Sequence, residues 1–312
     1  MQDDIVVSYV VTVFNKEPYI GCTVKSLLQQ EGKIPSEYIF VDDVSSDRSV
    51  EIIREKTANI PNVTIIENTV NEGPSIRLNQ GARIARGKYL QFIDSDDILA
   101  ANATQVMLSL MERHNADMVH GGWERTNIES VKLLGRRVPD NAPYKMSEEP
   151  YKFIFSERIR RMSQMVRRNS FMEAGGCDER VFIQDESLGL RLARVIKKII
   201  LLEAPVLLIP QVEGELSLNV SQLNHDRFLA HYDMLMDFPD LDETIRHQLY
   251  RRCVSSAWKQ QRHDKPLLLA LATPEFSRYL FSKCKMPMAD TNHLQAMKQL
   301  FDHIRGVRRV HQ

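Results

Sequence analysis

The sequence has 312 residues, and its 41 Lys+Arg are balanced by 41 Asp+Glu, so the formal net charge is +0. Proteins that bind nucleic acid through the phosphate backbone carry a surplus of basic residues, so this balance argues against a nucleic-acid partner. Hydrophobic residues make up 43% and charged residues 26%, which is typical of a folded protein rather than a disordered one. A chain of this length forms one large domain or two moderate ones.

Targeting signals are weak in this sequence. The N-terminal residues show neither the basic region nor the small-residue cleavage site of a signal peptide. The most apolar run, Val195–Ile209, is interrupted by two lysines and a glutamate, so we expect no transmembrane helix there. The cysteines lie far apart without CxxC spacing, which favours reduced thiols: Cys22, Cys177, Cys253 and Cys284. We therefore expect a cytoplasmic protein.

Apolar runs alternate with helix-like segments in the first hundred residues. Runs rich in Val, Ile, Phe and Tyr predict strands at Ile5–Val13, Tyr38–Val41, Val63–Ile66 and Tyr89–Ile93. Helical spacing of apolar residues predicts intervening helices over Tyr19–Gln30, through Val50–Ile53 and over Pro74–Ile84. Ser45 or Ser46 is expected to cap the second helix. This alternation predicts an α/β protein with a largely parallel sheet covered by helices on both faces.

The pattern changes along the rest of the chain. Residues 121–149 are broken by Gly and Pro, with a strand-like piece at Val131–Leu134. A helix over Ser187–Val195 and strands at Ile199–Leu202 and Val206–Ile209 follow. Amphipathic helices then dominate, over His225–Phe238, Leu241–Gln260, Pro266–Leu271 and Asn292–Ile304. We expect two domains, an α/β domain over residues 1–215 and a helical region over residues 216–312.

Acidic residues follow two predicted strands directly. The run Asp94-Ser95-Asp96-Asp97 comes after one strand, and Asp42-Asp43 after another. Ligands of parallel sheets bind outside the carboxyl ends of the strands, and crowded carboxylates there need a cation to offset them. Because Mg²⁺ commonly takes one or two carboxylates plus substrate phosphates, Asp94 and Asp96 fit a metal–diphosphate site. The alternative is an Asp-rich turn before a helix.

The end of the first strand also carries functional candidates. Phe14 directly follows this strand and could stack on a base, and Asp43 could accept a hydrogen bond from a base or ribose. The alternatives are Phe14 as a core residue and Asp42-Asp43 as a turn. Polar groups at three successive strand ends would converge on one crevice, which favours the functional interpretation.

Four blocks resemble the signature motifs of family 2 glycosyltransferases, in the family's order and at similar spacings. They read TVFNKEPYI at 12–20, VDDVSSD at 41–47, NEGPSIRLNQG at 71–81 and ARGKYLQFIDSDD at 85–97. The resemblance covers residues 5–210 and implies a GT-A fold, a Rossmann-like, mostly parallel sheet flanked by helices, with a helical C-terminal extension. It also implies inverting transfer from a nucleotide-sugar, commonly a UDP-sugar, with Mn²⁺ or Mg²⁺ as cofactor.

The resemblance assigns roles by position in these blocks. It implies that Thr12, Phe14 and Asp43 contact the nucleoside. Asp94 and Asp96 match the metal-binding DxD motif, with Ser95 in the same donor-binding block. Arg77 lies in the block whose basic residue approaches the diphosphate, and a surface helix arginine is the alternative.

The family's catalytic base lies in a later block. The matching segment here reads GGCDE at 175–179 and then QDESL at 184–188. The resemblance implies that Asp185 is the base, although Gln184 replaces the family's Glu and Glu186 is a competing candidate. A helix N-cap is the alternative role for Asp185. The family's later histidine motif has no histidine here, where residues 211–217 read QVEGELS.

Basic residues gather in two places, near the middle of the chain and at its end: Arg158, Arg160, Arg161, Arg167 and Arg168, then Arg305, Arg308 and Arg309. Each cluster is either a solvated face or a contact with an anionic partner, such as a phosphate-bearing acceptor or a membrane surface. The resemblance to family 2 glycosyltransferases implies a glycan or lipid-linked acceptor in bacterial envelope polysaccharide synthesis. Peripheral contact with the inner membrane face and a homo-oligomer through the C-terminal helices are further expectations.

Two other classes of protein compete with this hypothesis. A sugar-nucleotide nucleotidyltransferase would carry a Gly-rich loop after the first strand, but residues 14–18, FNKEP, contain no glycine. A non-catalytic sugar-nucleotide-binding protein would keep the fold and lose the base. The retention of Asp94, Asp96 and Asp185 favours an enzyme.

Overall fold

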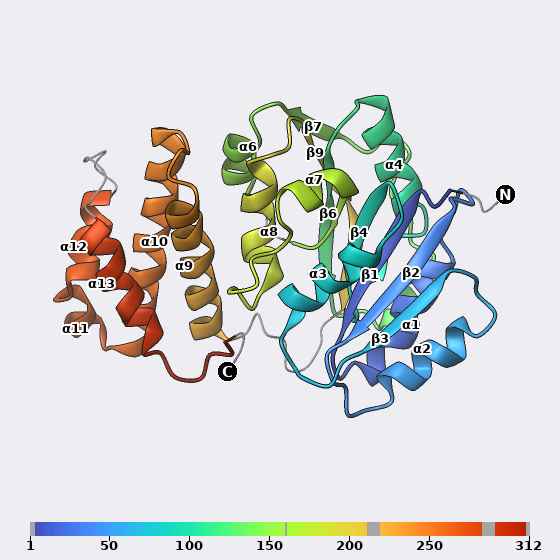
Figure 1. Cartoon of the computed structure of the whole chain (residues 1–312), viewed down its shortest axis with the longest axis horizontal. Coiled ribbons are helices and arrows are strands. Elements are labelled where there is room, and N and C mark those ends of the chain that lie inside the picture. The colour runs from blue at the N-terminus through green and yellow to red at the C-terminus, as the bar shows by residue number, and fades with distance from the viewer. Residues whose placement is uncertain (1–3, 160, 211–218, 283–290, 310–312) are drawn as a thin grey trace. The chain divides into compact units, whose positions relative to one another are not determined.

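The computed structural model describes residues 4–159, 161–210, 219–282 and 291–309 (Figure 1). Their contacts divide the chain into two compact units. The first unit takes in the chain up to Cys177 and the stretch from Arg191 to the end of the last strand, and the second takes in Asp178–Leu190 and the C-terminal helices. The domain boundary expected after residue 215 stays a prediction.

The first unit is built on one sheet. Over the described residues the sheet has nine strands in the order β3-β2-β1-β4-β8-β6-β9-β5, with β7 beside β9. The strands are β1 (Val7–Val13), β2 (Ser36–Asp42), β3 (Val63–Glu67), β4 (Tyr89–Asp94), β5 (Ile98–Leu99), β6 (Met118–Thr126), β7 (Tyr144–Ser147), β8 (Gln164–Arg167) and β9 (Ile199–Pro210). Strands β3, β2, β1 and β4 pair in parallel, as do β6 and β9, while β8, β5 and β7 pair antiparallel.

Helices connect these strands. They are α1 (Glu17–Leu28), α2 (Ser49–Thr57), α3 (Pro74–Ile84), α4 (Ala103–Arg113), α5 (Ser130–Leu133), α6 (Pro150–Glu157) and α7 (Arg168–Glu173). Proline lies in the first turn of α1, α3 and α6, where its fixed φ suits the helix and its missing N–H is not needed. Both faces of the central strands β1 and β4 are buried, which explains their nearly continuous apolar sequences.

Three local predictions were wrong. The strand-like piece at 131–134 is the short helix α5. The two strands predicted between residues 199 and 209 are one strand, β9, whose Pro205 lies opposite Gly122 at an irregularity of β6. Proline is tolerated inside a sheet at such an irregularity. Helix α2 has no side-chain cap from Ser45 or Ser46; instead the Asp47 side chain accepts the backbone N–H of Ser49 at 3.0 Å.

The second unit is helical. It holds most of α8 (Gln184–Ala193) and, after it, α9 (Val220–Asp237), α10 (Glu243–Asp264), α11 (Leu267–Leu271), α12 (Pro274–Ser282) and α13 (Thr291–Asp302). Asn219 and Asp242 cap α9 and α10 through their side-chain oxygens. The rings of Phe228 and Phe301 stack with centroids 4.4 Å apart and join α9 to α13. Among the described residues after 218, four of the five helices match predicted helices, and α12 was not predicted.

Two further expectations concern membranes and cysteines. Across the described ranges, no helix combines the length and the apolar character that crossing a membrane requires. Cys22, Cys177 and Cys253 are free thiols, in line with the expectation of reduced cysteines. Cys284 lies outside the described residues.

Candidate active site

The carboxyl ends of β1, β2 and β4 lie side by side in the first unit. Thr12 of β1 is opposite Val41 of β2 on one side and Asp94 of β4 on the other. Because neighbouring strands are about 4.8 Å apart, the three strand ends span about 10 Å. Phe14 and Asp43 directly follow β1 and β2. The structure therefore brings the predicted nucleoside and metal residues to one edge of the sheet.

The loops after β1 and β2 interlock through hydrogen bonds. The backbone N–H of Asn15 donates to Ser45 Oγ at 2.9 Å, and the Asn15 side-chain oxygen accepts the N–H of Ser46 at 2.8 Å. The backbone N–H of Glu17 donates to the Asp47 carboxylate at 2.9 Å. The first two motif blocks, far apart in sequence, therefore form a single hydrogen-bonded structure that frames the strand edge.

The loop after β2 is turned sharply by Asp42. Its Oδ2 accepts the backbone N–H groups of Val44 and Ser45, each at 3.0 Å. Val44 has a φ of 70°, in the left-handed region that disfavours a β-branched residue. Strained backbone of this kind persists where surrounding contacts over-determine it, and it is frequent beside binding sites.

Asp43 is held by three donors. Its carboxylate accepts the backbone N–H of Glu72 at 2.9 Å, the N–H of Gly73 at 2.8 Å and the Nε of Arg77 at 2.7 Å. The side chains of Arg77 and Asp43 are only 4% and 6% exposed. Gly73 has a φ of 92°, which glycine adopts without strain, and so lets the chain present these N–H groups at the start of α3.

Arg77 is therefore not a surface helix arginine, and that alternative was wrong. Its guanidinium is buried against Asp43 and also lies 3.1 Å from Glu72. The structure thus places Arg77 with the residue predicted to contact the nucleoside. Its approach to the diphosphate stays a prediction.

The Asp94–Asp97 segment forms a tight turn after β4. The backbone N–H of Asp97 donates to the Asp94 carbonyl at 3.1 Å, and the buried Ser95 accepts the Thr23 hydroxyl through its own carbonyl at 3.0 Å. The interpretation of this segment as a turn and its interpretation as a site are therefore compatible. The turn fixes the backbone, while the carboxylates remain at the strand edge.

Lys16 offsets the charge of this acidic turn. Its Nζ lies 2.5 Å from Asp96 Oδ2, and the two side chains are 24% and 17% exposed. Burial by itself would lower the pKa of Lys16, but the carboxylates of Asp96, Asp94 and Asp97 together raise it. Sequence reasoning missed Lys16, although it lies inside the first motif block, two residues after Phe14.

A divalent cation is compatible with these residues. Within the described part of the chain, no three His, Cys, Asp or Glu side chains gather into a ready protein cage. Mg²⁺ needs no such cage, because it commonly binds one or two carboxylates and completes its shell with phosphate oxygens and water. Asp94 and Asp96 offer only oxygen ligands, and the partly exposed Asp96 would exchange Lys16 for the metal.

The predicted base belongs to the second unit. Asp185 lies in the first turn of α8, which begins at Gln184, so the N-cap alternative for Asp185 was wrong. Its competitor Glu186 is buried and accepts Arg227 Nε at 2.8 Å. This ion pair with Arg227 occupies the Glu186 carboxylate. The segment 211–217, where the family's histidine motif was sought, lies outside the described residues.

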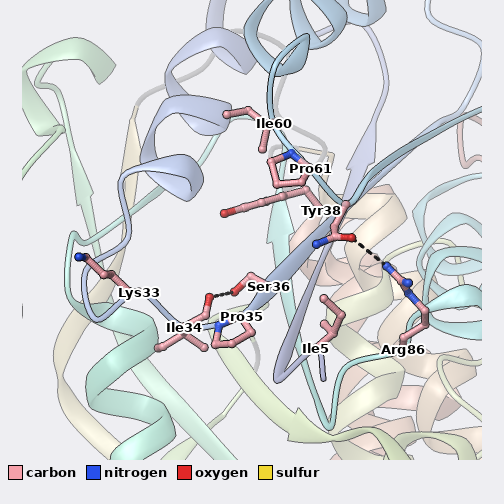
Figure 2. Close-up of a pocket in the computed structure, with 10 residues that line it drawn as sticks. Ile5, Lys33, Ile34, Pro35, Ser36, Tyr38, Ile60, Pro61 and Arg86 are labelled. Atoms are coloured by element: carbon pink, nitrogen blue, oxygen red, sulfur yellow. Dashed lines mark hydrogen bonds between the residues drawn. The ribbon is translucent and has the colours of Figure 1, made fainter. Parts of the chain in front are cut away.

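A pocket of about 400 Å³ opens at the other end of the strands (Figure 2). Its lining includes Ile5 before β1, Ser36 and Tyr38 at the start of β2, and Arg86 after α3. It contains none of the predicted site residues. The parallel strands start at this end, whereas ligands of such sheets bind at the carboxyl ends, so the pocket does not compete with the acidic edge as the active site.

Comparison with known proteins agrees with this geometry. The model of glycosyl transferase family 2 matches residues 8–174, more than half of the chain, and the chain belongs to this family. An uncharacterized glycosyltransferase of Haemophilus influenzae is 32% identical over 130 residues, which is 41% of this chain and 52% of that protein. A poly(ribitol-phosphate) beta-glucosyltransferase of Bacillus spizizenii is 34% identical over 127 residues, 40% of this chain and 20% of that protein.

A third relative and two solved structures add to the comparison. A UDP-Glc:alpha-D-GlcNAc-diphosphoundecaprenol beta-1,3-glucosyltransferase of Escherichia coli is 29% identical over 129 residues, 41% of this chain and 50% of that protein. These matches span about half or less of each relative. S. aureus TarS with UDP-GlcNAc superposes with a TM-score of 0.65 at 19% identity, covering 89% of this chain and 79% of that one.

The second solved structure is a mannosyltransferase of Pyrobaculum calidifontis with GDP-Man and Mn²⁺. It superposes with a TM-score of 0.59 at 15% identity, covering 96% of this chain and 88% of that one. At these identities the likeness shows the fold alone, which is the predicted GT-A fold with a helical C-terminal region.

Proposed function

We propose that this protein transfers a sugar, with inversion, from a UDP-sugar to a hydroxyl of a glycan or lipid-linked acceptor in bacterial envelope polysaccharide synthesis. One observation carries the proposal. The buried Asp43–Arg77 pair lies at the end of β2 and the acidic Asp94–Asp97 turn at the end of β4, on either side of β1 and inside the family-matched segment. One side of this edge thus has directional hydrogen-bonding groups for a base or ribose, and the other has carboxylates for a metal–diphosphate.

The roles of the residues follow from their positions. Thr12 and Phe14 would line the nucleoside pocket beside Asp43, which Arg77 holds in place. Ser95, at the turn, would support the donor diphosphate, and Asp94 and Asp96 would hold Mn²⁺ or Mg²⁺. The bound cation supplies Lewis-acid stabilisation of the departing diphosphate.

The transfer step needs a proton acceptor. We assign this role to Asp185, which lies in the first turn of α8 at the position of the base in the family's block, with Glu186, paired with Arg227, as the competing candidate. As the acceptor oxygen forms its bond to the anomeric carbon, its proton passes to Asp185. The bond from that carbon to the diphosphate oxygen breaks on the opposite face, and the nucleoside diphosphate leaves.

The acceptors named for two relatives share a chemical feature. One is a poly(ribitol-phosphate), and the other is an N-acetylglucosamine linked to a lipid through a diphosphate. Both present a hydroxyl close to a phosphate. This shared feature supports an acceptor of that class for the present chain.

The donor half of the proposal is tested by a panel of nucleotide-sugars. We expect Mn²⁺-dependent release of UDP from a UDP-sugar and calorimetric binding of UDP in the presence of Mn²⁺. Asp96→Ala should abolish the metal-dependent part of UDP binding, whereas Lys25→Ala, a change on α1, should not. A protein that binds UDP-sugars but never releases UDP, with or without an acceptor, would be a binding protein instead.

The helical unit exposes an unusual apolar surface, which we call the leucine patch: Leu267, Leu268, Leu269, Leu271, Leu280 and Phe281. Leu268 is 81% exposed. Exposed Arg262 and Lys265, with the exposed Asp264 between them, precede this patch along the chain. Apolar side chains beside basic ones are typical of a surface that rests on anionic lipid. We therefore propose that the cytoplasmic protein contacts the inner membrane face through the leucine patch.

Vesicles test the membrane proposal directly. The protein should co-sediment with phosphatidylglycerol vesicles at low salt, and Leu268→Asp should weaken this binding at least tenfold. Val131→Asp, a change of another exposed apolar residue in the first unit, is the matched control. If Leu268→Asp instead leaves vesicle binding unchanged and converts a dimer to a monomer, the patch is a contact between copies of the chain.

A further inference from the structure

The strand β6 ends at the same edge of the sheet as the acidic turn. Leu90 of β4 is opposite Val166 of β8, and Val166 is opposite Met118 of β6. Both pairings are antiparallel, so β6 runs parallel to β4. Asp94 lies four residues after Leu90 along β4, and Trp123 lies five residues after Met118 along β6. Trp123 is therefore level with the start of the Asp94–Asp97 turn. Two strand spacings, about 10 Å, separate them across the sheet.

The backbone before Trp123 is specialised. The register of β6 against β9 shifts between Gly121 and Gly122 and again between Gly122 and Trp123. A Cβ on Gly121 would lie 2.1 Å from the Val206 side chain, so only glycine fits there. Irregularities of this kind re-aim a side chain and are frequent beside active sites. Here they precede a tryptophan that is 44% exposed.

An arginine lies over this tryptophan. The guanidinium carbon of Arg161 is 5.0 Å from the centroid of the Trp123 ring. Arg161 is half-buried, and within the described ranges no carboxylate forms an ion pair with it. It lies three residues before Gln164, the first residue of β8, which runs between β4 and β6. Arg161 is therefore on the segment that enters the sheet between Trp123 and the acidic turn.

Buried groups fix the position of Arg161. His120 Nε2 lies 3.1 Å from the Arg161 carbonyl oxygen, to which it donates, and 3.3 Å from Ser163 Oγ. Gly121 and Ser163 exchange two further bonds, from the Gly121 N–H to the Ser163 carbonyl and from Ser163 Oγ to the Gly121 carbonyl, each 2.6 Å. The two segments that carry Trp123 and Arg161 are therefore joined behind the exposed pair.

We propose that Trp123 and Arg161 form the acceptor subsite, and that it takes a sugar or sugar-alcohol unit with a phosphate beside it. The proposal rests on the proposed function and names the acceptor side of the same edge. The tryptophan face suits the C–H face of a carbohydrate unit, while the planar guanidinium binds phosphate oxygens with two parallel hydrogen bonds. A lysine would lack both the stacking and this geometry.

Tryptophan fluorescence can test the subsite without relying on activity. The chain has two tryptophans, Trp123 and Trp258, and Trp258 packs on Phe276 and Tyr279 in the helical unit. Trp258→Phe leaves Trp123 as the single reporter, and Trp123→Phe leaves the other as the matched control. The probes are a ribitol phosphate oligomer, an N-acetylglucosamine diphosphate with a short prenyl chain, free ribitol and inorganic phosphate.

We expect a phosphate-bearing carbohydrate probe to change the emission of the Trp258→Phe protein and not that of the Trp123→Phe protein. Its affinity should exceed that of ribitol or of inorganic phosphate at least tenfold. Whichever of the two phosphate-bearing probes binds more tightly identifies the source of the acceptor. Arg161→Gln should weaken binding of that probe about tenfold, and Arg161→Lys should restore only part of the loss.

Calorimetry on the protein with both tryptophans repeats the Arg161 comparison, so the test does not depend on the folding of the Trp258→Phe protein. UDP binding with Mn²⁺ serves as the donor readout and should be the same in Arg161→Gln. The proposed subsite is overturned if UDP binds and UDP-sugars are turned over, but no phosphate-bearing probe changes the emission of Trp123 or binds more weakly to Arg161→Gln. Loss of UDP binding in the unaltered protein would instead contradict the proposed function.

Discussion

The two units of the molecule balance buried charge in different ways. In the sheet unit, Asp43 accepts two backbone N–H groups and the guanidinium of Arg77, which also contacts Glu72. In the helical unit, Arg180 is shared by three aspartates, with Asp178 at 2.6 Å, Asp233 at 3.3 Å and Asp237 also in contact. The helical cluster therefore has more acid than base.

This difference appears in the pKa of one group. Burial raises the pKa of Asp233 from 3.8 to about 7, Arg180 opposes the shift, and Asp178 and Asp237 add to it. A strongly shifted pKa often marks an active site. Here it marks a cluster of the helical unit, whereas at the sheet edge Arg77 pairs with Asp43 and Lys16 pairs with Asp96. In this protein the strand ends and their ion pairs, rather than a strongly shifted pKa, mark the candidate site.

The largest expected effect separates the proposed chemistry of the helical unit from donor binding in the sheet unit. Asp185→Asn should lower the transfer rate by about 10²–10⁴, the usual contribution of a positioned base. UDP binding with Mn²⁺ should change by less than about threefold, because the donor residues lie in the sheet unit. Glu186→Gln is the matched control. If Glu186→Gln lowers the transfer rate more than Asp185→Asn does, Glu186 rather than Asp185 is the base.

The second effect tests the charge pairing of the sheet unit. Arg77→Met should leave Asp43 buried and uncompensated and reduce the free energy of unfolding by about 3–5 kcal/mol. The control is Arg54→Met, which removes an ion pair with Glu67 whose side chains are 55% and 50% exposed, and should cost less than about 1 kcal/mol. Urea unfolding measures both. Equal losses in the two variants would show that Asp43 needs no arginine.

The third effect concerns the uneven cluster of the helical unit. Because the folded-state pKa of Asp233 is raised to about 7, the folded protein keeps this proton after the unfolded chain has lost it. The contribution to unfolding free energy is therefore favourable at low pH and falls as pH rises from about 4 to 7. Asp233→Asn should remove this fall and stabilise the helical unit at pH 8 by about 2 kcal/mol, measured by thermal unfolding.

His120 makes the stability of the sheet unit depend on pH in the opposite direction. Burial lowers the pKa of His120 from 6.5 to about 4, so the folded protein resists taking up a proton. Stability of this unit is then complete above pH 6.5 and falls as pH drops toward 4. A pH series of melting curves should show the two units changing in opposite directions over this range. A parallel shift of both transitions would contradict the comparison.

The smallest effect comes from the strained loop after β2. Val44→Gly should relieve the left-handed backbone strain and stabilise the sheet unit by about 1 kcal/mol. The greater freedom of glycine in the unfolded chain offsets part of this gain. Val131→Gly, in the helix α5, should instead destabilise. A loss of stability on Val44→Gly would mean that the Val44 side chain contributes more than its backbone costs.

Local sequence patterns predicted the helices and strands that depend mainly on residues close together in the chain. The first four strands of the sheet and their helices followed from apolar spacing, and the acidic edge followed from where those strands end. The pairs that define the edge were not predictable in the same way. Lys16 and Asp96 are 80 residues apart, and Asp43 and Arg77 are 34 apart. Only the parallel register brings them together, and the motif blocks named Arg77 without naming its partner.

The antiparallel part of the sheet was harder to predict. Strand β8 has four residues and β5 has two, too short for an alternating pattern to be recognised. The sequence of α5 predicts a strand as readily as a helix, because Val and Leu fit both structures over four residues. Trp123 carried no signal in the sequence, because its position depends on the irregular backbone at Gly121 and Gly122.

The contact between Lys16 and Asp96 has a consequence for the order of events at the site. With the ammonium group of Lys16 already bound to Asp96 in the acidic turn, we expect the fold not to depend on a metal ion. A chelator such as EDTA should then shift the melting temperature by less than about 1 °C. The cation would then enter together with the nucleotide, because the diphosphate oxygens supply the additional metal ligands that Asp96 alone does not provide. The protein would thus select a metal–nucleotide complex as its first ligand and leave free divalent ions in solution largely unbound.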